Sequence, residues 1–270
     1  MWRWAIVIFF SLIGLGLLVM IGLVMGGYWL EVRQSGGESA AGPSGRKNGE
    51  VAGWDEFDYN GVRYRYVWRE IAEPAKLRLY PNFEAKAQTA GLAERRQCSL
   101  LVNGGFYDEA GQPLGWWYSE GEELGKVSQS QLLDGFVTMT YDGEVEIGRR
   151  RPNDLTKRRW GLQTGPLFIS DGQPRKLTIK NDGAARRVVM GVTESQKVIF
   201  GVMVGEKSLT SGPKLADLPE IVMLLAEASN ATISAAVNLD GGSASAFLDE
   251  GLTISELTPI GSYFCYRPNN

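Results

Sequence analysis

The 270-residue sequence predicts an α+β fold: a strand-dominated single domain with mixed or antiparallel sheets and a few helices, preceded by one N-terminal transmembrane helix. Three observations support this prediction. Short apolar runs recur on either side of turn dipeptides such as Asn60-Gly61 and Asp142-Gly143, a pattern typical of hairpins. Two segments read as helices. The first thirty residues are rich in large apolar side chains and nearly free of charge.

The N-terminal segment predicts a membrane anchor over residues 1–30. Residues 4–30 contain no charged side chain, and a bilayer core needs about 20 apolar residues. A signal-peptide core is usually about 7–15 residues long and ends in small residues, so cleavage near Gly26-Gly27 is the alternative. Arg3 and Arg33 flank the span, and their placement gives only slight support to a periplasmic or extracellular C-terminal domain.

Residues 31–53 are predicted to form a flexible tether. From Gln34 to Glu50 the chain is rich in Gly, Ser and Ala and has no aromatic or large aliphatic residue. Such a segment cannot bury enough apolar surface to offset the entropy of ordering. No internal repeat or second linker follows, so residues 54–270 are predicted to be one domain.

Within this domain the predicted strands come first as hairpins. Segments 57–68, 135–148 and 166–177 turn at Asn60-Gly61, Asp142-Gly143 and Asp171-Gly172. Nearly continuous apolar runs over 186–193 and 197–205 predict buried strands. Two helices are predicted, an Ala-rich one over 83–95 and one over 219–228. In the second, Pro219 suits the first turn, and Ile221, Leu224 and Leu225 share one face. A strand over 232–239 then leads to Asp240.

Composition excludes several chemistries. The chain has no histidine, which excludes a Ser-His-Asp triad, a His-bound metal and imidazole acid–base catalysis. The net charge of −3, with acidic and basic residues interspersed, makes nucleic acid an unexpected partner. The two cysteines, Cys98 and Cys265, form either a disulfide, if the domain is outside the cytoplasm, or two buried free thiols.

Two strand ends share one pattern. An apolar run leads to Asn103-Gly104-Gly105, and another leads to Asn238, Asp240 and then Gly241-Gly242. Alternation along a strand puts Asn238 and Asp240 on one side, and the glycines can turn backbone N–H groups towards an anion. A tight turn closed by Asp240 itself is the alternative. Two such ends suggest two rims of one cleft.

Further candidate groups lie near these ends. Phe106, Tyr107, Trp116 and Trp117 could stack on a sugar ring, although core packing is the commoner fate of such residues. Thr164-Gly165 could expose a hydroxyl and a backbone donor. Arg186-Arg187 precedes an apolar strand, and arginine suits phosphate recognition, although such a pair is more often solvated surface.

Taken in order, the segments NGGFYD, QTGPLFISDG, RRVVMG and NLDGGSAS resemble the phosphodiester glycosidase family. The resemblance extends over residues 57–266. The family includes the lysosomal enzyme that uncovers mannose-6-phosphate by removing N-acetylglucosamine, together with bacterial envelope and exopolysaccharide-associated proteins. Val188 stands where the family has Thr or Ser. Ser243 and Ala244 stand where it has Gly and Ser.

The resemblance implies hydrolysis of a sugar-1-phosphodiester, without metal or cofactor, by a domain that a membrane segment over residues 4–30 anchors. The substrate would be a sugar-1-phosphodiester or glycan of the envelope or extracellular space. A non-catalytic glycan- or phosphate-binding module in exopolysaccharide assembly or export is the alternative, favoured by Val188 and Ala244. A metal-dependent phosphodiesterase is a third. The implied catalytic residues are Asp240, Asp108 and Arg187, and the implied substrate-binding residues are Asn103, Gly104, Gly105, Thr164, Gly165, Asn238, Gly241, Gly242 and Ser243.

Overall fold

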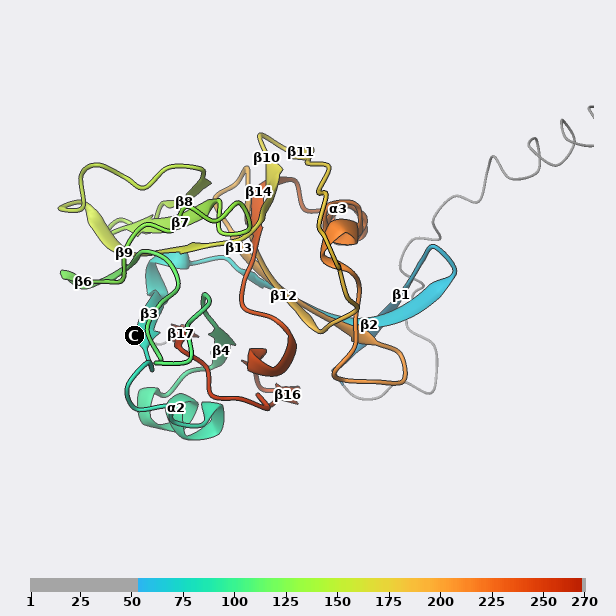
Figure 1. Cartoon of the computed structure of the whole chain (residues 1–270), viewed down its shortest axis with the longest axis horizontal. Coiled ribbons are helices and arrows are strands. Elements are labelled where there is room, and N and C mark those ends of the chain that lie inside the picture. Colours follow the sequence, from blue (N-terminus) through green and yellow to red (C-terminus); the bar gives the residue numbers. More distant parts are fainter. Residues whose placement is uncertain (1–52, 269–270) are drawn as a thin grey trace, which may run out of the picture. The chain divides into compact units, whose positions relative to one another are not determined.

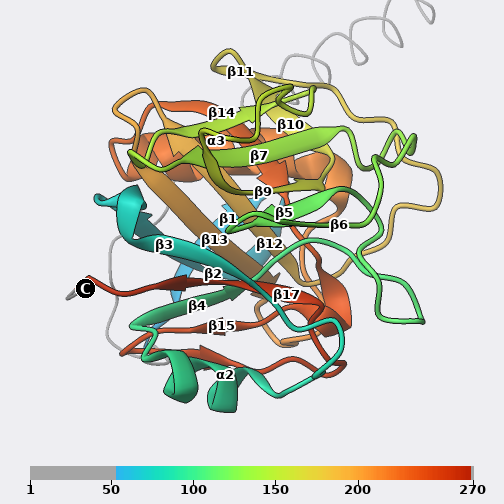
Figure 2. The same cartoon turned by 90° about the vertical axis from the view of Figure 1, so that its left-hand side faces the viewer.

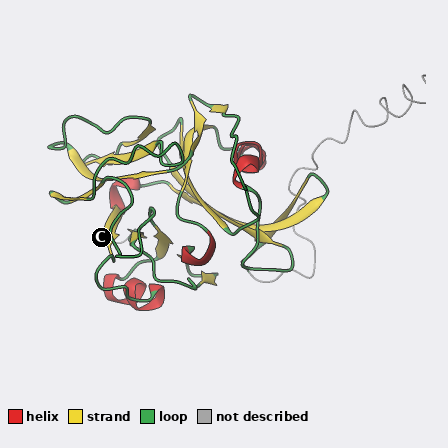
Figure 3. Cartoon of the chain, in the orientation of Figure 1, coloured by secondary structure: helices red, strands yellow, loops and turns green. Residues whose placement is uncertain are grey.

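The computed structural model describes residues 53–268, which form a strand-dominated domain of three sheets (Figure 1). The predicted anchor and almost all of the predicted tether lie outside the described residues. No helix within 53–268 is both long and apolar enough to cross a bilayer. Figure 3 shows how far strands outweigh helices in the described part of the chain.

The largest sheet has seven strands in the order β1-β2-β13-β12-β14-β10-β11. Each pairing in it is antiparallel. Helix α3 (Leu218–Ala228) packs its apolar face against one side of this sheet. The strands are β1 (Asp55–Tyr59), β2 (Val62–Ile71), β10 (Leu167–Ser170), β11 (Gln173–Pro174), β12 (Arg187–Thr193), β13 (Val198–Gly205) and β14 (Ile233–Asn238).

Two five-stranded sheets face the other side, and Figure 2 shows one above the other. Their pairings are also antiparallel, so of the mixed or antiparallel sheets that the sequence predicts, the described residues form the antiparallel kind. One sheet has the order β16 (Thr253–Ile254), β15 (Phe247–Leu248), β4 (Leu100–Asn103), β17 (Ser262–Tyr266), β3 (Leu77–Pro81). The other has the order β6 (Glu122–Leu124), β5 (Trp117–Ser119), β9 (Arg158–Thr164), β7 (Gly135–Thr140), β8 (Val145–Gly148).

One aromatic cluster joins the three sheets. Phe264 of β17 lies with its ring centroid 5.3 Å from that of Trp160 in β9 and 5.3 Å from that of Phe200 in β13. All three side chains are fully buried. Aromatic residues of this size dominate core energetics, so the last strand of the chain fixes how the sheets meet.

The three hairpin predictions are confirmed. They succeed because the residues within a turn determine its backbone conformation. Asn60 and Gly61 both have positive φ, 49° and 73°, as the turn between β1 and β2 requires.

Helix α3 begins one residue earlier than predicted. The helix predicted over 83–95 is wrong in its first half, since α2 is Thr89–Arg96. Lys86 takes a left-handed conformation, and the Asn82 amide binds the Ala87 backbone, which holds that part as a loop.

Cys98 and Cys265 form a disulfide, with their Cα atoms 5.3 Å apart. Cys98 lies two residues after the end of α2, and Cys265 lies in β17, in register with Leu101 of β4. The bond therefore fastens the segment entering β4 to the strand beside it. Of the two alternatives that the sequence leaves open, the structure selects the bridge.

Candidate active site

Four segments that are far apart in the sequence meet at the end of β14. They are the ends of β4 and β9 with the turns that follow them, the start of β12, and the loop that leaves β14. In Figure 1 the chain runs from β14 towards β4 and β16. Three backbone N–H groups each donate one hydrogen bond to another segment: Asn238 to Pro166 (3.1 Å), Leu239 to Val188 (2.8 Å) and Asp240 to Gly104 (3.1 Å).

Asn103 holds the loop that carries Asp240. Its Nδ2 donates to the carbonyl oxygens of Asp240 (2.7 Å) and Gly104 (3.2 Å). Its Oδ1 accepts the N–H of Ala246 (2.9 Å). One buried amide thus fastens both ends of the loop. Because its two hydrogens are used within the protein, the structure gives Asn103 a positioning part, where the sequence suggests contact with a sugar.

The glycines after β4 allow close packing. A Cβ at Gly104 would overlap Oγ of Ser262, and one at Gly105 would lie 2.9 Å from Cδ1 of Leu162. Gly104 N–H donates to Ser262 C=O (2.7 Å), so it does not face a ligand. Only glycine lets the end of β4 pass this close to β17 and β9.

Thr164 and Asn238 fasten the turn between β9 and β10 to β14. Thr164 is fully buried, and its Oγ1 donates to the carbonyl oxygen of Asn238 (2.8 Å). The prediction of an exposed hydroxyl is therefore wrong. Asn238 Nδ2 donates to the carbonyl oxygens of Gly165 (3.2 Å) and Leu239 (2.7 Å). The peptide bond from Gly165 to Pro166 is cis.

Asp240 is a largely buried carboxyl with a raised pKa. Removal from water raises its pKa to about 7, opposed in part by a hydrogen bond from the Gly241 backbone. Within residues 53–268 it forms no salt bridge. At neutral pH the carboxyl therefore occupies both protonation states and can accept or give a proton.

Arg187 is the register neighbour of Asp240 but turns to another carboxylate. Val189 of β12 pairs with Asn238, and continuing this register puts Arg187 opposite Asp240. Its Nη2 instead donates to Gly183 C=O (2.7 Å) and lies 3.5 Å from Oδ1 of Asp182. Burial lowers the pKa of Arg187, and Asp182 acts in the opposite direction. Because the Arg187 guanidinium lies beside Asp182, it does not pair with Asp240.

Arg186 is a site residue that sequence reasoning did not select from the arginine pair. It is buried, and its guanidinium donates to the carbonyl oxygens of Leu209 (2.7 Å), Ser245 (3.1 Å) and Ser255 (3.1 Å). Its own carbonyl oxygen accepts the Gly242 N–H (2.8 Å). A cation thus lies against the glycine-rich loop. Adjacent residues of a strand face opposite sides, which was the available signal that the two arginines have different roles.

The rest of the loop after Asp240 is a short 3-10 turn, η3 (Gly242–Ala244). Gly242 has φ of 61°, which favours glycine. Ser243 is exposed, and its carbonyl oxygen accepts the N–H groups of Leu257 (2.7 Å) and Thr258 (3.1 Å). The loop is therefore held on its outer side by segment 255–259.

Asp108 lies apart from this network. It is exposed, and its Oδ1 accepts the Gln112 N–H (2.8 Å), which closes a turn. Within the described residues no hydrogen bond or salt bridge joins it to the other candidate residues. Trp116 and Trp117 are almost fully buried in core clusters, so core packing, and not a sugar platform, is what the structure shows for them.

Buried polar atoms without a partner lie in these segments and in the adjacent strand β17. In the part of the chain that the structure describes, seven buried side-chain nitrogen or oxygen atoms lack a hydrogen-bond partner. Three of them are Oδ1 of Asn238, Oγ of Ser245 and Oγ of Ser262. Such groups are rare in folded proteins, and their recognised explanations are local strain, a catalytic role, or a bound water or ion.

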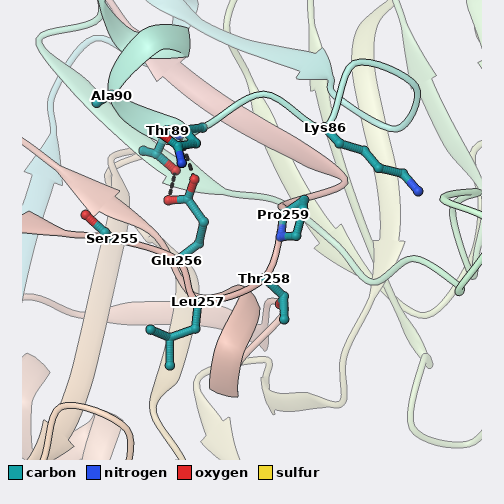
Figure 4. A pocket seen from close by; sticks show the side chains of 9 residues that line it. Lys86, Thr89, Ala90, Ser255, Glu256, Leu257, Thr258 and Pro259 are labelled. Atoms are coloured by element: carbon teal, nitrogen blue, oxygen red, sulfur yellow. Dashed lines mark hydrogen bonds between the residues drawn. The ribbon is translucent and has the colours of Figure 1, made fainter.

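A pocket adjoins the same loop (Figure 4). It has a volume of about 260 Å³ and lies between the start of α2 and segment 255–259. Figure 4 shows the Glu256 carboxylate turned towards Thr89, whose N–H donates to it (2.7 Å). Because Ser243 binds Leu257 and Thr258, the pocket shares a wall with the loop that Asp240 begins.

Comparison with known proteins places this geometry in a family. No curated protein matches the chain. The catalytic domain of zebrafish N-acetylglucosamine-1-phosphodiester alpha-N-acetylglucosaminidase superposes with a TM-score of 0.62 at 17% identity, covering 85% of this chain and 87% of that one. A hypothetical protein from Synechocystis superposes with a TM-score of 0.52 at 14% identity, covering 79% and 62%. A family model for phosphodiester glycosidase matches residues 96–261, more than half of the chain. The chain belongs to the phosphodiester glycosidase family.

Proposed function

We propose that the protein is a hydrolase that cleaves the bond between the anomeric carbon and the phosphate oxygen of a sugar-1-phosphodiester. Family membership supports glycosidase-type hydrolysis of sugar phosphodiesters. The observation that carries the proposal is the carboxyl of Asp240, raised in pKa to about 7 at the junction of four segments. A pKa near the working pH is what a general acid or base requires.

In the proposed reaction Asp240 acts as a carboxylate. It accepts a proton from water as the water oxygen attacks the anomeric carbon, the carbon–oxygen bond to phosphate breaks, and the phosphate monoester leaves with the bonding electrons. The transition state has oxocarbenium character, which a nearby carboxylate stabilises. Phosphate is a good leaving group, so a chain without histidine can perform this step. Asp108 is the other carboxyl proposed from the sequence.

The cationic groups around the loop support anion binding. Arg186 is buried against the backbone of Gly242 with carbonyl partners only, among the residues described. Arg187 lies opposite Asp240 in register. We propose that the substrate phosphate lies on the Gly241–Ser243 side of the loop and draws the Arg187 guanidinium from Asp182. The pocket beside segment 255–259 would take a polar group of the substrate.

We further propose that the domain works outside the cytoplasm, anchored through residues 4–30, on envelope or extracellular glycoconjugates. The apolar N-terminal segment supports the anchor. The disulfide between Cys98 and Cys265 supports an oxidising compartment, because such bonds are rare in the cytosol.

The test uses purified full-length protein and a panel of sugar-1-phosphodiesters, with free reducing sugar as the readout from about pH 5 to about pH 9. We expect sugar release that rises as pH passes about 7, is insensitive to chelator and falls about a thousandfold in Asp240→Asn. Binding of a panel member without turnover would support the binding module instead. Turnover abolished by chelator would support the metal-dependent phosphodiesterase.

A matched pair of variants tests the positioning part of Asn103. Asn103→Ala removes three hydrogen bonds and leaves buried backbone groups unpaired, so unfolding free energy should fall by about 2–4 kcal/mol. Asn82 is equally buried and also makes three hydrogen bonds, to Ala87 and Ile260. Asn82→Ala should cost similar stability in chemical denaturation, whereas only Asn103→Ala should also lower kcat. Equal kcat in the two variants would contradict the assigned role.

A further inference from the structure

A basic groove lies on the outer face of the sheet β6-β5-β9-β7-β8, away from the core. Residues 149–159, RRRPNDLTKRR, hold six basic side chains and one acidic one in a chain of net charge −3. The expectation of evenly interspersed charge overlooks this cluster. The groove has a volume of about 610 Å³. Its charged lining residues are Arg150, Arg151, Lys157, Arg158, Glu146 and Asp154.

The charges of the groove are only partly balanced. Arg158 pairs with Glu146 (2.8 Å), and Arg151 pairs with Glu123 (2.6 Å). The side chains of Arg150 and Lys157 are exposed and make no hydrogen bond or salt bridge to another residue of 53–268. The Nε atoms of Arg151 and Arg158 are buried and also lack a partner among those residues. The lining therefore presents a net positive charge, with Arg150 and Lys157 as its unpaired cations within the described part of the chain.

The aromatic side of the groove is built into the sheet. Arg151 lies with its guanidinium carbon 5.2 Å from the ring centroid of Trp116, whose Nε1 donates to the same Glu123 carboxylate (2.7 Å). Phe136, from the edge of the groove, packs with its ring centroid 6.2 Å from that of Trp116. These contacts hold Arg151 in place, so the groove is a formed surface of the sheet.

The groove begins close to the candidate active site. Phe136 of β7 pairs with Gly148 on one side and Gln163 on the other. Gly148 and Gln163 are therefore two interstrand spacings apart, about 10 Å. Gly148 leads directly into the basic segment, and Gln163 precedes Thr164. A second link is Asp134, which lies 3.8 Å from Arg149 and accepts the N–H of Leu167 (2.8 Å) in the turn after β9.

We propose that this groove binds further anionic repeats of a phosphodiester-linked glycan while one sugar-1-phosphodiester of the same chain occupies the site at Asp240. This inference rests on the proposed function and specifies its substrate class, a polymer. Phosphate groups of the polymer pair with the exposed side chains of Arg150 and Lys157. A concave surface fits a single polymer chain, whereas a bilayer is flat, so we favour the polymer over an anionic membrane.

The test measures binding of a labelled glycerol-phosphate oligomer, a polymeric phosphodiester, to purified full-length protein at low salt. Arg150→Gln/Lys157→Gln should bind roughly tenfold more weakly, with a shallower dependence on salt. The matched control Lys176→Gln/Lys207→Gln removes the same charge from exposed lysines elsewhere and should bind like wild type. Turnover of a small sugar-1-phosphodiester should be unchanged in both.

The other outcomes separate this inference from the proposed function. Equal affinity in the groove variant and the control overturns the groove. Loss of binding to phosphatidylglycerol vesicles or to single-stranded DNA, with oligomer binding unaffected, also overturns it and assigns the surface to a membrane or to nucleic acid. If the groove variant loses oligomer binding but wild type hydrolyses no sugar phosphodiester, the groove stands and the proposed hydrolase fails.

Discussion

Asp240→Asn is expected to lose turnover by about a thousandfold and, at pH 8, to be more stable than the wild type by about 2–4 kcal/mol. The reason is the cost of ionising a desolvated carboxyl. Burial raises the pKa of Asp240 from 3.8 to about 7 in the folded protein. Asparagine carries no charge, and its Oδ1 can still accept the Gly241 N–H, so the variant avoids this cost.

The pH dependence gives the sign of the effect. Below about pH 4 the carboxyl is protonated in both the folded and the unfolded chain, so wild type and variant should differ little. Between about pH 4 and about pH 7 the unfolded chain ionises while the folded chain retains its proton, and the wild type loses stability relative to the variant. Above about pH 7 the difference reaches its plateau.

Thermal and urea unfolding of the two proteins across this range measures the difference. Asp108→Asn is the matched control, because it makes the same substitution at an exposed carboxyl outside the Asp240 loop. A variant that is less stable than wild type at pH 8 would show that the carboxylate is stabilised by its surroundings. In that case the Asp240 carboxylate would not lower the stability of the folded protein.

Removal of the disulfide is expected to lower the free energy of unfolding by about 2–5 kcal/mol. Cys98 and Cys265 are 167 residues apart, so the bond closes a loop that includes most of the domain. Long loops give the largest effect when the unfolded chain is the state constrained. The variant Cys98→Ala/Cys265→Ala avoids placing a hydroxyl at Cys265, which is fully buried.

Urea unfolding of the double variant and of reduced wild type measures this effect. The two should agree with each other, and both should be less stable than oxidised wild type. A change in the double variant that reduction does not reproduce would assign the loss to packing at Cys265 and not to the bond. Because the bond fastens β17 beside β4, we also expect weaker turnover in the double variant and in reduced wild type.

The sequence predicts the local elements of this fold better than their partners. The turns at Asn60-Gly61 and Asp171-Gly172 were predictable because positive φ favours these residue types. The insertion of β17 between β3 and β4 was not. Pairings between residues more than 150 positions apart depend on how the apolar faces of whole sheets fit together. Neither turn dipeptides nor the spacing of apolar residues indicates how those faces fit together.

In the candidate site, too, local features were predictable from the sequence and long-range contacts were not. The motifs locate the four segments that meet at Asp240, because glycine pairs and strand ends are visible as residue types. The direction of each polar side chain is not visible. The residue types of Asn103 and Thr164 do not indicate whether their side chains face a sugar or, as the structure shows, neighbouring backbone. For Arg186 and Arg187, strand alternation predicts different faces but not that the first is buried beneath the loop.

The position of β17 also determines when the site can exist. Strand β4 ends at Asn103, yet both of its neighbours, β15 and β17, come from residues after Ala246. During synthesis from the N-terminus, β4 therefore has neither of these two strand partners until residues after Ala246 have been made. Contacts between residues this far apart in the sequence raise the contact order of the fold, which slows folding. The network around the Asp240 loop is complete only after the residues of β17 have been made, so the candidate site cannot form in a nascent chain that lacks this strand.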